Sequence, residues 1–386
     1  MKPTSQMTLD VYFRQCVGID ISKDKFTACL YMYDRVSDVG CCTKSIDFAN
    51  TKSGFNQMVR WSRKEAVKSH PLTYLMEPTG VYYEHLAYHL QKIGQIVYVV
   101  LPNKARKFCE SEGIKTKTDA MDARCLALMG CVSRKLKPWY PPAPIYRELR
   151  QMTRFHADLC EVRTSVANRM EALDHMEGTV KSVHKNCEKL LQEIDTLMEK
   201  NDKAIMKKVA EDEELQARVK RIATAKGVRE PTIVCVIAET EGFHYIENRK
   251  QLVGYAGLDV KAKQSGKEDP RHCISKKGNA HIRTALYMPA LTAIRYNRQI
   301  KAAYGRICQK HPNEKMIGVA AAMRRLLLLI YTLWKNGEEY DETRDMTHTP
   351  RKKEPDMDYG PNDCIGRIDN EPVDWNAVNE NGEPPF

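Results

Sequence analysis

Two aspartates stand three residues apart in EGIKTKTDAMDARCLALM, the stretch that covers residues 112–129. The apolar residues that follow predict a helix, and this spacing places Asp119 and Asp122 on one helical face, where like charges repel by roughly 0.2–0.5 kcal/mol. A capping box, in which Thr116 caps the helix and Asp119 returns a hydrogen bond, is one explanation. The helix dipole also favours acids in the first turns. The alternative is a divalent cation bound by both carboxylates.

Two further acids end predicted strands. QCVGID ends at Asp20, and LTYLME ends at Glu77. Acids at the ends of neighbouring strands meet at one edge of a sheet, and a later helix can bring two more to them. Four carboxylates repel strongly unless cations neutralise them, and hard oxygen ligands suit Mg²⁺ or Mn²⁺. Two such ions about 3.5–4 Å apart stabilise the attacking and leaving oxygens of phosphoryl transfer. The predicted metal ligands and catalytic acids are Asp20, Glu77, Asp119 and Asp122.

The first third of the chain has the pattern of an α/β domain. Periodicity predicts the order β-β-β-α-β-α-β-α, which indicates a mixed sheet with helices on its faces. Gly94 is expected to end the second helix. The predicted strands are residues 15–20, 26–33, 41–48, 72–77 and 95–102, and the helices between them are residues 51–67 and 81–94.

The rest of the chain is predicted to be mainly helical. A proline-rich break, PWYPPAP, precedes heptad-spaced apolar residues that run to Leu197 and are interrupted near Gly178. This pattern favours a coiled coil or helical hairpin used for self-association, with a solitary packed helix as the alternative. A helix–turn–helix follows around Gly227, and the tail after Gly337 is acidic and predicted to be disordered. The predicted divisions are residues 1–135, 136–215, 216–338 and 339–386.

Composition limits the function classes. The 386 residues carry a net charge of +11, which favours a polyanionic partner such as nucleic acid. Thirteen cysteines without a CxxC pair argue against a zinc finger and favour reduced thiols over a disulfide framework. No signal sequence is evident, and the longest apolar run, LLLLIYTLW, is too short to span a bilayer. A cytoplasmic protein without a membrane partner is expected.

Several longer stretches resemble one protein family. VGIDISKDKF, MEPTGVYYEHLAYHLQKIG, VYVVLPNKARKF and KTKTDAMDARCLA lie in the first third, and FHYIENRKQLVGYAGLDVKAKQSGK, ISKKGNAHIRTALYMPAL and AAAMRRLLLLIY lie in the last. In order and spacing the chain resembles the DEDD transposases of the insertion-sequence one-hundred-and-ten family, which are related to the Piv invertase. The resemblance covers roughly residues 15–130 and 216–335.

The resemblance implies a ribonuclease H-like (RuvC-like) catalytic domain in which the four acids bind two Mg²⁺ or Mn²⁺ ions. It also implies a coiled-coil spacer and a C-terminal transposase domain with a nucleophilic serine, which here matches Ser265 in KQSGK. The implied partners are donor and target DNA, a guide non-coding RNA encoded by the element, and further copies of the chain in a dimer or tetramer. A prokaryotic, nucleoid-associated recombinase with a covalent phosphoserine intermediate is the expected function.

Alternatives remain for individual residues and for the whole. Ser265 could be an ordinary turn residue, and Ser275 is a competing serine that fits the start of a helix or a phosphate contact. A hydrolytic RuvC-like endonuclease is the main alternative function, followed by a non-catalytic nucleic-acid binder; the bulky turn ISKDK disfavours an actin-like kinase. Basic residues suited to phosphate, or else a solvated charged face, are Lys261, Lys263, Lys267, Lys276, Lys277 and Arg283.

Overall fold

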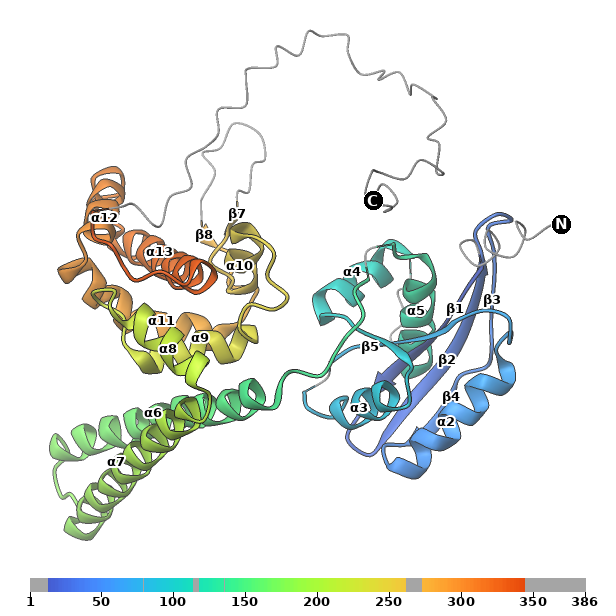
Figure 1. Cartoon of the computed structure of the whole chain (residues 1–386). Coiled ribbons are helices and arrows are strands. Elements are labelled where there is room, and N and C mark those ends of the chain that lie inside the picture. The colour runs from blue at the N-terminus through green and yellow to red at the C-terminus, as the bar shows by residue number, and fades with distance from the viewer. Residues whose placement is uncertain (1–12, 79, 114–117, 135, 262–272, 344–386) are drawn as a thin grey trace, which may run out of the picture. The chain divides into compact units, whose positions relative to one another are not determined.

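The computed structural model describes residues 13–78, 80–113, 118–134, 136–261 and 273–343. The chain divides into two compact units, residues 1–143 and 144–386, which we call the sheet unit and the helical unit (Figure 1). The acidic tail lies outside the described residues from position 344 onward. The four-part division expected from the sequence stays a prediction.

The sheet unit is built on a mixed six-stranded sheet with the order β3-β2-β1-β5-β6, in which β4 also pairs with β2. Strands β1 and β2 are antiparallel, whereas β1, β5 and β6 run parallel. The single strand predicted for residues 41–48 is wrong, because two short strands pair with opposite ends of β2 instead. The strands are β1 (Phe13–Ile21), β2 (Lys25–Asp34), β3 (Val39–Cys42), β4 (Ile46–Ala49), β5 (Leu72–Met76) and β6 (Ile96–Val99).

Helices cover both faces of this sheet (Figure 1). Side chains alternate along a strand, so Val17 and Ile19 of β1 pack with α2 (Lys52–Glu65) and α3 (Glu84–Lys92). Cys16 belongs to the opposite core, with α4 (Pro102–Ser111) and α5 (Asp119–Val132). Gly94 has a φ of +75° just after α3, as expected for a residue that ends a helix. The sequence pattern did not predict α4 as a separate helix.

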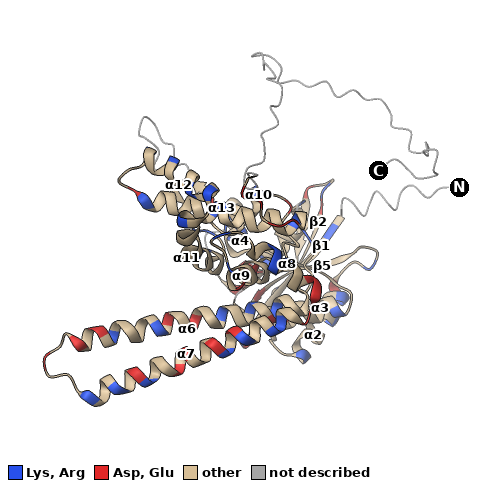
Figure 2. Ribbon diagram, turned by 60° about the vertical axis from the view of Figure 1, so that its left-hand side comes forward, with Lys and Arg blue, Asp and Glu red and all other residues tan. Residues whose placement is uncertain are grey.

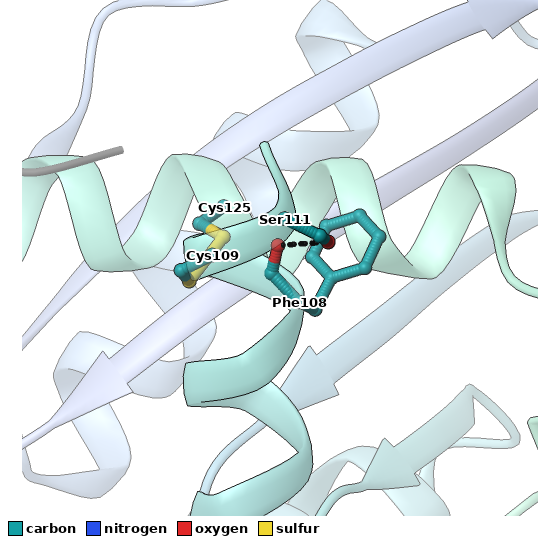
Figure 3. The surroundings of a disulfide bond; sticks show 4 residues. All are labelled: Phe108, Cys109, Ser111 and Cys125. Atoms are coloured by element: carbon teal, nitrogen blue, oxygen red, sulfur yellow. Dashed lines mark hydrogen bonds between the residues drawn. A yellow bond between two sulfur atoms is a disulfide. The ribbon is translucent and has the colours of Figure 1, made fainter. Parts of the chain in front are cut away.

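A disulfide joins the two helices on the α5 face. Cys109 of α4 and Cys125 of α5 are bonded, with their Cα atoms 6.0 Å apart (Figure 3). Ser111, near the end of α4, donates a hydrogen bond of 2.7 Å to the Phe108 carbonyl. The expectation of reduced thiols is therefore wrong for this pair. Cysteine spacing along the chain could not show it, because only the packing of α4 on α5 brings the two sulfurs together.

The helical unit begins with a long antiparallel hairpin (Figure 1). Its two helices, α6 (Pro144–Asp174) and α7 (Lys181–Ala210), are separated by a turn that contains Gly178, whose φ is +74°. The solitary-helix alternative is therefore wrong. Ile194 is buried in this hairpin, whereas Leu190 and Leu197 are 43% and 45% exposed. The heptad residues thus divide between an internal stripe and an exposed one.

The remaining helices pack into a single hydrophobic core around α13 (Lys315–Asn336). Helix α13 has 22 residues, and an 18-residue window within it has a mean hydropathy of 1.7, so it is long and apolar enough to cross a membrane, but 67% of that window is buried inside the protein. The apolar run at residues 326–334 lies within this longer helix, which forms the centre of the core. The other helices are α8 (Glu213–Ala223), α9 (Glu230–Thr240), α10 (Arg249–Tyr255), α11 (Ala280–Tyr296) and α12 (Arg298–Lys310).

Candidate functional site

Strand register places four polar residues, two of them predicted acids, in a row on the α5 face of the sheet. Asp20 of β1 pairs with Thr27 of β2, which pairs with Asp47 of β4. On the other side of β1, Ile19 pairs with Met76, so Glu77 follows at the next position of the parallel pair. Cross-strand partners lie on the same face of a sheet. Backbone pairing alone thus gathers three carboxylates and a threonine.

The N-terminus of α5 supplies the other two acids. Thr118 is the N-cap and accepts a hydrogen bond of 3.3 Å from the Met121 amide. A capping box needs an acidic side chain three positions after the cap, and that position holds Met121. The capping box expected for Thr116 and Asp119 is therefore wrong, and Thr116 itself lies outside the described residues. Both aspartates do lie in the first turn of α5, where the helix dipole favours negative charge.

Close packing fixes α5 over the end of β1. A Cβ on Gly18 would lie 2.1 Å from the Ala123 carbonyl oxygen and 2.1 Å from the Ala127 amide nitrogen, so only glycine fits there. Farther along, Gly130 packs against Cys16. The helix therefore runs antiparallel to β1, and its N-terminal acids lie toward the end of the strand that carries Asp20.

Lys25 and Asp47 were not selected from the sequence. The Lys25 ammonium lies 2.9 Å from an Asp47 oxygen and 3.7 Å from an Asp119 oxygen, at a hollow of about 430 Å³. Thr27 donates a hydrogen bond of 2.6 Å to Asp47. This bond and the one from Lys25 lower the pKa of Asp47. A separate strand predicted at residues 46–49 and paired with β2 would have placed Asp47 opposite Thr27. The single strand predicted for residues 41–48 did not give this pairing.

The donor set fits a hard divalent cation, because every candidate ligand is a carboxylate. The backbone places Asp20 near the end of β1, Glu77 directly after the adjacent strand β5, and Asp122 one residue before Ala123, which contacts Gly18. Among the described residues, no three His, Cys, Asp or Glu side chains are close enough to hold a metal ion together. Asp119 instead makes its ion pair with Lys25.

The second predicted site lies at a short hairpin in the helical unit. Strands β7 (Val260–Lys261) and β8 (Cys273–Ile274) pair antiparallel, and the segment between them, with Ser265, Lys263 and Lys267, lies outside the described residues. Lys261 belongs to β7. The structure thus brings the four acids to one unit and assigns the hairpin to the other.

Ser275 has a structural position at the base of this hairpin. Its hydroxyl donates to the Asp259 carboxylate, and its amide donates to the Asp259 carbonyl at 2.7 Å. Ser275 does not start the next helix, because Asn279 is the N-cap of α11 and accepts a hydrogen bond from the Ile282 amide. One of the two interpretations of Ser275, the start of a helix, is therefore wrong.

The basic residues after β8 differ in their contacts. Lys276 and Lys277 are exposed. Nη1 of Arg283 donates to the carbonyls of Ala256, Gly278 and Asn279 at 2.9–3.1 Å, so this side chain also holds the loop together. Figure 2 shows basic and acidic residues interspersed along α6 and α7. A role in phosphate binding stays a prediction for the whole set.

Comparison with known proteins covers both units. A family model described as a transposase of the DEDD type matches residues 17–179, and a second, described as the transposase IS116/IS110/IS902 family, matches residues 219–305. The chain belongs to this family. It is 28% identical to a pilin gene-inverting protein of Moraxella bovis over 335 residues. The aligned region covers 84% of the chain and 97% of the relative. Identity to the pilin gene-inverting protein of Moraxella lacunata is 29% over 338 residues, with the same coverage.

Membership of the transposase family confirms the resemblance seen in the motifs. The two matches include all four acids and Ser265, and the first also spans the whole of α6. As a transposase the chain is a DNA-processing protein whose substrates are DNA.

Proposed function

We propose that this transposase cuts and rejoins DNA as the recombinase of a mobile insertion element. In this proposal Asp20, Glu77, Asp119 and Asp122 bind two Mg²⁺ or Mn²⁺ ions, and Ser265 becomes covalently joined to the cut strand. The observation that carries the proposal is the convergence of acids in the sheet unit. Register places Asp20, Glu77 and Asp47 in one row, and the fit at Gly18 fixes the acid-bearing turn of α5 at the same end.

Divalent ions at these acids would neutralise charge on the phosphate and on the oxygens that attack and leave. The protein's own contribution is to hold the carboxylates on rigid elements before DNA arrives. Asp20 lies within the β1–β2 ladder, and α5 is fixed by the contact at Gly18 and by the disulfide to α4. Positioning of this kind lowers the barrier because the ligands need no rearrangement during the reaction.

Ser265 would perform the step that a nuclease lacks. Its hydroxyl oxygen forms a bond to phosphorus while the bond from phosphorus to the leaving deoxyribose oxygen breaks. The serine proton is lost and the leaving oxygen gains one, so no external oxidant or nucleotide is consumed. The phosphoserine keeps the energy of the phosphoester bond for joining to a second strand. The basic residues beside the hairpin would balance phosphate charge.

Assembly of several copies would bring the two kinds of site together. Val183, Leu190 and Leu197 recur every seven residues on α7 and are 43–45% exposed, so they can pair with a second copy. We therefore include a homodimer or tetramer in the proposal. A guide RNA encoded by the element is also included, as the resemblance in the motifs implies, and the net charge of +11 suits such a polyanionic partner. DNA inversion of the kind named for the Moraxella relatives is one reaction that this chemistry allows.

The deciding experiment is to trap a protein–DNA adduct. Wild-type protein, its RNA and both DNA partners are incubated with Mg²⁺ or with a chelator, and adducts are located by peptide mass spectrometry. We expect an adduct at Ser265 only with metal, and none with Ser265→Ala. Ser275→Ala is the matched control and should still form the adduct at Ser265, although removing the Asp259 contact can lower its yield. Wild-type cutting by Ser265→Ala without any adduct would instead identify a hydrolytic nuclease.

A further inference from the structure

Glu239 is a buried carboxylate that the proposed chemistry does not use. It lies near the end of α9 and is only 1% exposed. Burial of a charge is costly unless the charge is paired. Arg154 of α6 supplies the pair, donating from Nε at 2.7 Å and from Nη2 at 2.9 Å to the two carboxylate oxygens. Such two-point pairing fixes orientation as well as distance.

The same residue contacts both flanks of the β7–β8 hairpin. Asn279, which follows β8 and caps α11, donates from Nδ2 to a Glu239 carboxylate oxygen at 2.6 Å. Tyr255, the last residue of α10 before β7, donates from its hydroxyl to the Glu239 carbonyl at 2.8 Å. The Asn279 amide in turn donates to the Tyr255 carbonyl at 2.7 Å. These three bonds form a closed network at the base of the hairpin.

Backbone packing makes this network stiff. A Cβ on Gly278 would lie 2.4 Å from the Tyr255 carbonyl oxygen and 2.5 Å from the Gly257 amide nitrogen. The two flanks therefore touch backbone to backbone, without room for a side chain. Arg150, one turn before Arg154 on α6, donates to the Ala238 carbonyl at 3.0 and 3.1 Å and so fixes the end of α9. The hairpin is thus connected to α6 through α9.

The electrostatics favour an ionised network. Burial raises the pKa of Glu239, but the hydrogen bonds from Arg154 and Asn279 outweigh it, and the resulting pKa lies below the usual value of 4.5. The hydrogen bond to Glu239 raises the pKa of Arg154. Both groups therefore stay charged near neutral pH.

We propose that Glu239 is a positioning residue for strand transfer, which with Arg154 and Asn279 holds the β7–β8 hairpin in a fixed place on α6. The segment between the two strands contains Ser265, so this anchor sets where that segment leaves and rejoins the folded unit. The inference rests on the proposed role of Ser265. Because α6 also forms the hairpin with α7, the anchor fixes the serine-bearing chain to the element that we expect to mediate assembly.

The test separates positioning from stability by comparing single and double variants. Glu239→Gln leaves Arg154 without its carboxylate and should lower both the melting temperature and the rate of adduct formation at saturating DNA. The double variant, Glu239→Gln with Arg154→Met, also removes the charge that would be left unpaired, so its melting temperature should return most of the way to the wild-type value. We expect the double variant to remain at least roughly tenfold slower in adduct formation, which corresponds to about 1.4 kcal/mol.

A matched control is available on the same helix. Arg163 pairs with Asp195 through bonds of 2.6 and 3.4 Å, but both side chains are about half exposed, and the pair joins α6 to α7 rather than to the β7–β8 hairpin. Arg163→Ala should keep the wild-type rate of adduct formation. Hydrogen exchange gives a second measurement, since the amides of residues 273–279 should exchange faster in both Glu239 variants and not in Arg163→Ala.

Each outcome has a definite meaning. If the double variant recovers its adduct rate together with its stability, or if both Glu239 variants react like the wild type, the positioning role is wrong and the function of Ser265 stands. If the wild type itself forms no adduct at Ser265, the proposed function fails and the positioning role fails with it. A slow double variant with normal DNA affinity supports the inference.

Discussion

The sheet unit and the helical unit fix their candidate groups by different physical means. In the sheet unit, ladder hydrogen bonds place Asp20, Thr27 and Asp47 side by side, and any residue at those register positions would lie there. The β7–β8 hairpin has only two residues in each strand and gains its position from side chains, chiefly Glu239 and Asn279. Replacing one polar side chain should therefore leave the fold intact at the site built on a strand ladder. The same kind of replacement should disturb the hairpin, because side chains hold it in place.

The largest expected effect tests the sheet unit. Asp122→Asn removes a charge without altering β1 or its partners, so we expect DNA cleavage in Mg²⁺ to fall by at least about a hundredfold, since even residues that only support metal ligands affect activity by up to that factor. The far-UV circular dichroism spectrum and melting temperature should remain close to those of wild type.

Asp24→Asn is the matched control, because Asp24 is an exposed aspartate in the turn between β1 and β2. It should cleave normally. Full activity in Asp122→Asn would remove this residue from the site and leave the helix dipole as the reason for its place in the first turn of α5.

A second prediction tests whether the helical unit needs a second copy. Leu190→Lys with Leu197→Lys places charge on the exposed stripe of α7, so the protein should become monomeric by light scattering and lose recombination while keeping its helical content. Ile194→Lys is the contrasting variant, because Ile194 is 4% exposed inside the hairpin and the charge should unfold it. An active oligomer of the double variant would exclude this stripe as the contact surface.

The smallest effect concerns the fit between β1 and α5. Gly18→Ala puts a Cβ 2.1 Å from backbone atoms of α5, so the helix must shift, with an expected loss of about 1–3 kcal/mol in the free energy of unfolding and slower cleavage. Gly305→Ala in α12 has no atom within 4 Å of the added Cβ and should gain up to about 1 kcal/mol. Denaturant unfolding of both variants measures the difference. Equal stabilities would show that α5 is not fixed at Gly18.

Much of the sheet unit could be predicted because its information is local. The apolar runs that end at Asp20 and Glu77 predict strands, and Gly94 ends a helix where expected. The strand predicted for residues 41–48 failed because pairing with β2 divides it, and this pairing depends on residues distant in the chain. Asp47 was missed for the same reason. The cap of α5 was misplaced by two residues, because two threonines, Thr116 and Thr118, precede the helix and only the backbone selects Thr118.

The family, the order of the main elements and the presence of acids that could share a cation can all be read from the linear chain, since motif spacing and periodicity are properties of that chain. The folded protein alone decided that α5 runs antiparallel to β1, that Cys109 meets Cys125, and that Lys25 lies between Asp47 and Asp119. It likewise decided that Glu239 binds Arg154, from a helix 85 residues away in the chain. Such contacts arise when elements pack, and packing depends on the fit of surfaces that no local pattern records.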